Sequence, residues 1–186
     1  MLLYYILVPL AWLVWHLVFR IQVIGRDNLK KVATPGSIIA PTHVSAIDPV
    51  FIIISRFWGK RMIVFGKKEL FEINPLLTWF FRCMGGVCVR GTREREGKIL
   101  PPKSGMFVVA AQAGVDVVPC RIFYDTPNGR AKLFCRVRVV YGEPMPAAQF
   151  AMQDKRDVKA MRAGKKALTE AWEQLGEPYA FAPKDA

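Results

Sequence analysis

One histidine and one aspartate stand five residues apart in the stretch SIIAPTHVSAIDPV, which covers residues 37–50. His43 and Asp48 follow a short apolar run whose length and composition are typical of a buried strand, and Pro41 ends that run. A neutral imidazole can accept a proton from a hydroxyl near neutral pH. It does so best when its other ring nitrogen donates to a carboxylate, which fixes the tautomer and stabilises the imidazolium. The spacing therefore predicts a general base, His43, oriented by Asp48.

The same two residues also allow an interpretation without chemistry. His43 would then be an ordinary loop histidine, and Asp48 would cap the helix that follows it. Two observations favour the catalytic interpretation. The chain has only two histidines, and the other one, His16, lies in an apolar segment. A loop held by a rigid strand is also where α/β proteins commonly carry functional side chains.

The elements that must position this pair are visible as alternating apolar runs and turn signals. We expect strands at residues 21–24, 37–40, 61–65, 87–89, 115–123 (interrupted by Pro119) and 131–141. We expect helices at residues 50–57, 76–84 and 103–113, and a final helix capped by Asp154. This pattern predicts an α/β fold in which helices flank a mixed β-sheet.

The N-terminal stretch is strongly apolar, because residues 1–19 contain no Lys, Arg, Asp or Glu. About twenty apolar residues can cross the hydrocarbon core of a bilayer. We therefore predict an N-terminal membrane helix over residues 1–20, followed by one domain over residues 21–186. Pro9 and His16 leave open whether this helix spans the membrane or lies in one leaflet, and a buried helix of a soluble domain is the alternative. The basic residues that begin at Arg20 place the remainder on the cytoplasmic face of the inner or plasma membrane.

The charge balance points to an anionic partner. The chain of 186 residues carries 27 Lys and Arg against 15 Asp and Glu, a net charge of +12. Because its mean hydropathy is +0.19 and no nucleic-acid-binding motif is present, an anionic membrane surface is favoured over nucleic acid. The four cysteines show neither CxxC spacing nor a nearby histidine, so we expect reduced, buried thiols and no metal site.

Three segments together resemble the glycerolipid acyltransferases, in particular the 1-acyl-glycerol-3-phosphate acyltransferases. THVSAIDP is similar to the family's first block, NH-x4-DP, with Thr42 in place of the asparagine. Residues 66–90, GKKELFEINPLLTWFFRCMGGVCVR, resemble the second block: a KELF-like element, a helix begun by Pro75, and G-x-x-x-x-R ending at Arg90. Val118-Pro119 matches the fourth block.

The third block of the family, a strand ending in FPEGTR, is only half present. Gly91, Thr92 and Arg93 follow Arg90 directly, and Arg90 stands where the glutamate belongs. The resemblance implies that one helix, one central strand and that glutamate are missing. Either the protein lacks them, or this sequence is shorter inside than the cellular protein. The second reading is favoured, because loss of a central strand would leave buried backbone groups unpaired.

The resemblance implies transfer of a fatty acyl group from acyl-CoA or acyl-carrier protein to the free hydroxyl of lysophosphatidic acid, giving phosphatidic acid. His43 would act as base with Asp48 as its partner, and neither a metal nor a bound cofactor would be needed. Further substrate-binding residues, chiefly for the acceptor phosphate, would be Arg90, Gly91, Thr92, Arg93 and Lys68. Two alternatives stay open: a membrane-anchored protein that has lost catalysis and binds anionic lipid or a partner, and an acyltransferase with a different lysolipid acceptor.

Overall fold

The computed structural model describes residues 2–45, 47–56, 61–67, 72, 74–83, 85–89, 102–152 and 157–182. Its strands are β1 (Arg20–Ile24), β2 (Ser37–Pro41), β3 (Val64–Lys67), β4 (Gly86–Val89), β5 (Asp116–Tyr124) and β6 (Arg136–Tyr141). Its helices are α1 (Leu2–Val18), α2 (Asp48–Ser55), α4 (Pro75–Cys83), α5 (Ser104–Ala113) and α6 (Val158–Gln174), with short 3-10 turns η1 (Arg26–Lys30) and η2 (Ala147–Phe150).

The strands form a four-stranded sheet in the order β1-β6-β5-β2 and a separate pair, β3-β4. The hairpin of β5 and β6 is antiparallel, whereas β1 runs parallel to β6 and β2 runs parallel to β5. The predicted mixed α/β fold is therefore confirmed. β5 extends beyond β2, because the last residue of β2, Pro41, pairs with Cys120 in the middle of β5.

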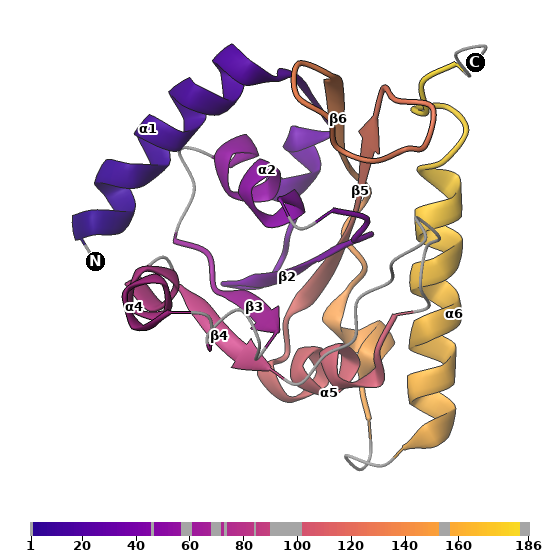
Figure 1. Ribbon diagram of the computed structural model, residues 1–186. Helices are drawn as coiled ribbons and strands as arrows, with labels where there is room; N and C mark the ends of the chain where they lie inside the picture. Colours follow the sequence, from indigo (N-terminus) through magenta and orange to yellow (C-terminus); the bar gives the residue numbers. More distant parts are fainter. Residues whose placement is uncertain are drawn as a thin grey trace.

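Helices cover both faces of the larger sheet (Figure 1). On one face, α1 and α2 pack over alternate residues of β5, among them Val118 and Cys120. On the other face, Val117 lies in a second apolar cluster with side chains of α5, η2 and α6. Alternation of side chains along one strand thus supplies both cores. Burial of apolar surface, at about 25 cal/mol per Å², holds the helices to the sheet.

Helix α1 has two different sides. Tyr4 and Val8 are buried, and the ring of Phe19, just after the helix, meets the ring of Phe51 edge-on with their centres 5.1 Å apart. The opposite side is apolar and exposed at Tyr5, Ile6, Leu10, Trp12, Leu13, Val14 and Leu17.

The structure does not support the N-terminal membrane helix predicted for residues 1–20. In the described part of the chain, no helix has the length and apolar character that a bilayer crossing requires. The sequence run is apolar in part because one side of α1 packs on α2 and the sheet.

Candidate active site

The loop between β2 and α2 leaves the sheet at a fixed point. The Thr42 backbone N–H donates to the carbonyl of Cys120 at 3.0 Å, one step beyond the end of β2, and the Thr42 side chain is buried. Helix α2 then begins at Asp48, with Pro49 in its first turn, where the missing N–H of proline costs no helical hydrogen bond. The two ends of a six-residue connection are thus anchored, and His43 lies at its start.

His43 and Asp48 are in contact, as their spacing predicts. Nδ1 of His43 lies 2.8 Å from Oδ2 of Asp48, and the same oxygen accepts the backbone N–H groups of Val44 (2.8 Å) and Ser45 (2.7 Å). The Asp48 side chain is fully buried, whereas that of His43 is 38% exposed. Because Asp48 engages Nδ1, Nε2 is the nitrogen of His43 that a substrate hydroxyl can reach.

Tyr124 completes the surroundings of Asp48, and sequence reasoning missed it. Its hydroxyl, at the end of β5, donates to Oδ1 of Asp48. Burial raises the pKa of Tyr124 far above its usual range, and the nearby Asp48 charge raises it further, so the phenol stays protonated and donates. Tyr124 follows the strand expected at residues 115–123 by one position. No spacing signal connects it with an aspartate 76 residues away.

The buried thiol of Cys120 lies on the same face of β5 as Tyr124. Burial raises the pKa of this thiol strongly, and the charge of Asp48 adds to the shift. Cys120 is therefore neutral near pH 7 and is not an activated nucleophile. Of these two side chains, the accessible imidazole of His43 is the one that could accept a proton from a hydroxyl near pH 7.

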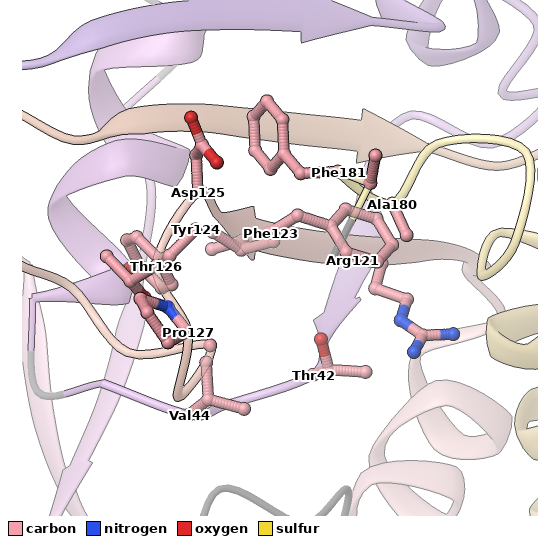
Figure 2. A pocket seen from close by; sticks show the side chains of 13 residues that line it. Thr42, Val44, Arg121, Phe123, Tyr124, Asp125, Thr126, Pro127, Ala180 and Phe181 are labelled. Carbon is pink, nitrogen blue, oxygen red and sulfur yellow. The ribbon is translucent and has the colours of Figure 1, made fainter. Parts of the chain in front are cut away.

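A cavity of about 340 Å³ adjoins the loop, within the size range of small-ligand sites. Thr42 and Val44, the neighbours of His43, lie on one side of it, and the end of β5 lies on the other (Figure 2). His43 itself is not among the lining residues. The remaining lining residues are Arg121, Ile122, Phe123, Tyr124, Asp125, Thr126, Pro127, Gly129, Ala180, Phe181 and Ala182.

Charged groups in the cavity wall are engaged with protein atoms. The Arg121 guanidinium donates to the carbonyl of Trp172 at 2.8 Å, and burial lowers its pKa. Asp125 accepts Nε of Arg136 at 2.6 Å. The cavity wall thus contains one cation and one paired carboxylate together with Thr42 and Val44, the neighbours of His43.

The other predicted site residues lie outside the described part of the chain. These are Lys68, Arg90, Gly91, Thr92 and Arg93. Their roles in binding the acceptor phosphate stay predictions, as do the catalytic roles of His43 and Asp48.

Comparison with known proteins fits this geometry. A sequence profile of the family described as Acyltransferase matches residues 20–90, a stretch that includes His43 and Asp48 and ends where the motif pattern breaks. The solved structure of the 1-acyl-sn-glycerophosphate (LPA) acyltransferase PlsC from Thermotoga maritima has a similar fold, with a TM-score of 0.57 at 20% identity. The likeness covers 85% of this chain and 73% of that one.

A curated relative is the chloroplastic 1-acyl-sn-glycerol-3-phosphate acyltransferase LPAT1 of Arabidopsis thaliana, 28% identical over 130 residues. The alignment covers 54% of this chain, and the chain spans only 35% of that relative's length. Since 54% of 186 residues is fewer than 130, part of the aligned relative has no counterpart here. The profile match and this relative show that the chain is similar to the glycerolipid acyltransferases, and the solved structure shows that its fold resembles that of PlsC.

Proposed function

We propose that this protein transfers a fatty acyl group from an acyl thioester, acyl-CoA or acyl-carrier protein, to the free hydroxyl of lysophosphatidic acid, giving phosphatidic acid. The observation that carries the proposal is the contact between Nδ1 of the accessible His43 and the fully buried carboxylate of Asp48. Such a pair prepares an imidazole to take a proton from a hydroxyl and stabilises the imidazolium that results.

The reaction needs one base and one displacement. Nε2 of His43 takes the proton of the acceptor hydroxyl while the oxygen attacks the thioester carbonyl. The tetrahedral intermediate then collapses, the C–S bond breaks, and the imidazolium returns its proton to the leaving thiolate. Asp48 keeps Nδ1 protonated throughout and offsets the positive charge on the ring. The proposed mechanism uses no metal and no bound cofactor.

The acceptor phosphate is assigned to residues beyond the described part of the chain. Arginine suits this role, because its guanidinium can bind phosphate oxygens in a bidentate manner. By resemblance to the family, the phosphate-binding group is Arg90, Gly91, Thr92 and Arg93, with Lys68 as a further substrate contact.

We also infer that the outer side of α1 lies on an anionic membrane surface, on the cytoplasmic face of the inner or plasma membrane. Seven large apolar side chains are exposed along this side, from Tyr5 to Leu17. The first charge after the helix is Arg20, and the whole chain carries a net charge of +12. An apolar helix face combined with excess positive charge is what binds an interfacial helix to anionic lipid. The lipid substrate and the lipid product would both remain in that surface.

The test is an acyl-transfer assay with lysophosphatidic acid and either acyl-CoA or acyl-carrier protein, applied to the wild type and to His43→Ala. We expect the variant to lose activity by about 10³-fold or more while its thermal unfolding is unchanged. His16→Ala is the matched control: it removes the only other imidazole, which is exposed and contacts the carbonyl of Trp12. Equal activity of wild type and His43→Ala would remove His43 as the base.

A second candidate function is lipid binding without turnover. It is favoured by Arg90 at the position of the family's glutamate, and by the part of the aligned Arabidopsis relative that has no counterpart here. Mass spectrometry of the protein from its own cells distinguishes the two, with a non-tryptic digest whose peptides cross residues 90–93. Peptides that contain an additional strand and a glutamate would favour the enzyme. Peptides that match this sequence, with no turnover but retained binding to vesicles containing lysophosphatidic acid, would favour the second candidate.

A further inference from the structure

We propose that Tyr124 is a positioning residue for the His43–Asp48 pair, whose hydroxyl fixes the Asp48 carboxylate and limits the negative charge that it presents to the imidazole. The inference rests on the proposed function, in which His43 is the base. It adds a residue outside the motif blocks by which the family is recognised in this sequence.

The two oxygens of Asp48 have partners of different origin. Oδ2 accepts three donors that all lie within five residues: His43 Nδ1 and the backbone N–H groups of Val44 and Ser45. Oδ1 accepts the hydroxyl of Tyr124, which is the last residue of strand β5 and lies 76 residues away in the sequence. Local donors alone would let the carboxylate rotate with its loop. The hydroxyl of Tyr124 ties the carboxylate plane to the sheet, so that Oδ2 stays directed at His43.

The same hydrogen bond has an electrostatic consequence. A buried carboxylate lies in a medium of low effective dielectric constant, where each hydrogen-bond donor offsets a substantial part of its charge. Removal of the Tyr124 hydroxyl would leave Oδ1 without this donor. The charge of Asp48 would then act more strongly on the imidazolium of His43, and His43 would hold its proton to higher pH.

Few other groups compete with this interaction among the described residues. The titratable side chains that act on the pair from β5 are Tyr124 and Cys120, and the thiol of Cys135, just before β6, acts on Tyr124. Burial raises the pKa of both Tyr124 and Cys120, so both are neutral near pH 7. The hydroxyl of Tyr124 is therefore the group through which β5 acts most directly on Asp48.

The fold offers a matched control on the same face of the sheet. Tyr141, in β6, is also buried, and its hydroxyl lies 2.5 Å from Oγ of Ser55 instead of Asp48. Both tyrosines belong to the same apolar cluster. Tyr141→Phe therefore removes a buried hydroxyl from the same core without changing the partners of Asp48.

The first measurement does not require turnover. Because the chain has only two histidines, protein labelled with ¹⁵N-histidine gives a simple spectrum, in which His43→Ala assigns the signals. We expect the titration midpoint of the His43 signal to rise by about 0.5 to 1 pH unit in Tyr124→Phe. The midpoint should be unchanged in Tyr141→Phe, and the His16 signal should be unchanged in both variants.

The second measurement is the pH dependence of kcat/KM, whose acid limb reports the base of the free enzyme. We expect this limb to move to higher pH in Tyr124→Phe by the same amount as the His43 midpoint. At the pH where the rate no longer changes, kcat should fall about tenfold while KM is unchanged. The reason is that the lost hydroxyl acts on His43 through Asp48 and not on the substrate. Tyr141→Phe should reproduce the wild-type profile.

A variant that retains both the ring and the hydroxyl protects the test against misfolding. 3-Fluorotyrosine in place of Tyr124 keeps the shape and makes the phenol a stronger donor, so the His43 midpoint should fall instead of rising. Identical midpoints in the wild type, Tyr124→Phe and the fluorinated protein would overturn the inference even if the enzyme is active. Absence of turnover in the wild type would instead contradict the proposed function, while the histidine spectrum would still report whether Tyr124 controls the pair.

Discussion

The indole N–H of Trp172 donates to the backbone carbonyl of Ala40 at 2.9 Å, across 132 residues of sequence. Ala40 lies in β2, three residues before His43, and both partners are buried. Helix α6 is thus hydrogen-bonded directly to the strand that precedes the loop carrying His43. The packing of Trp172 with Phe107 and Leu168 in the second apolar cluster supports the same contact.

Trp172→Phe tests the energetic weight of this contact. The variant keeps an aromatic ring but removes one of the donors to the buried carbonyl of Ala40, which also pairs with β5, so the free energy of unfolding should fall by about 0.5–1.5 kcal/mol. Urea denaturation followed by circular dichroism measures the change. Trp79→Phe, on the exposed side of α4, is the control and should leave the midpoint unchanged. Equal midpoints for all three proteins would mean that this hydrogen bond contributes nothing to stability.

Asp48→Asn should abolish most of the proposed acyl transfer while the fold is retained. The amide oxygen can take the place of Oδ2 and accept the same three donors, but it carries no full negative charge to stabilise the imidazolium of His43, so kcat should fall by about 10²–10⁴-fold. Asp116→Asn is a matched control, because Asp116 is also buried and accepts the backbone N–H groups of Ala33 and Ala147. That control should lose stability but keep its kcat. Similar kcat values for the two variants would contradict the assignment.

Alkaline pH should unfold the protein through groups that the fold keeps protonated. Burial raises the pKa of Cys120 above its ordinary 9.0, and that of Tyr124 and Tyr141 above 10.0. Above those values the unfolded chain releases protons that the folded chain retains, so stability is complete below about pH 9 and falls as pH rises, by up to about 1.4 kcal/mol per pH unit for each group.

Urea midpoints measured from about pH 8 to 11 would show this loss. Cys120→Ala should remove the loss of stability that begins nearest pH 9. Tyr5→Phe, at an exposed position, should leave the dependence of stability on pH unchanged. A stability that is constant over this range, in the wild type as in the Cys120 variant, would contradict the buried, protonated state of these groups.

Membrane binding should depend on the outer side of α1. Leu13→Glu and Leu17→Glu place a carboxylate on exposed apolar positions of this side, and each should weaken binding to vesicles rich in phosphatidylglycerol by at least about tenfold. Val109→Glu, exposed on α5 across the sheet, is the control and should bind like the wild type. Vesicle flotation gives the measurement. Unchanged flotation of both α1 variants would exclude this side of the helix as the docking surface.

Most elements of the fold could be predicted from the sequence, because apolar runs and turn residues are local signals. Their arrangement could not, since β6 lies between β1 and β5 and nothing in the periodicity specifies that order. β5 is continuous through Pro119, where an interruption was expected, because ladder contacts on both sides support it: Pro119 pairs with Ala40, and its carbonyl accepts the N–H of Gly142. The final helix is capped by Asp157, which accepts the N–H of Ala160, whereas the expected cap, Asp154, lies outside the described residues.

In the site, too, contacts between residues close in the sequence could be predicted, whereas contacts between distant residues could not. The His43–Asp48 contact was predictable because five residues of loop and one helical turn bring the two side chains together. Tyr124 was not predictable, because its contact depends on where β5 lies relative to α2. The two sides of α1 could not be distinguished from the sequence for a related reason: the run is apolar throughout, and only the structure shows that one side packs on a core while the other is exposed.

The three hydrogen bonds that converge on Oδ2 of Asp48 also bear on the order in which the protein folds. The three donors lie within five residues of the acceptor, so the loop can close without bringing distant segments together, at a small cost in chain entropy. The bond to Tyr124 spans 76 residues and must wait until β5 is in place beside β2. During refolding the pair of His43 and Asp48 would therefore assemble early and be locked late, and the return of activity would follow the docking of β5 instead of the closure of the loop.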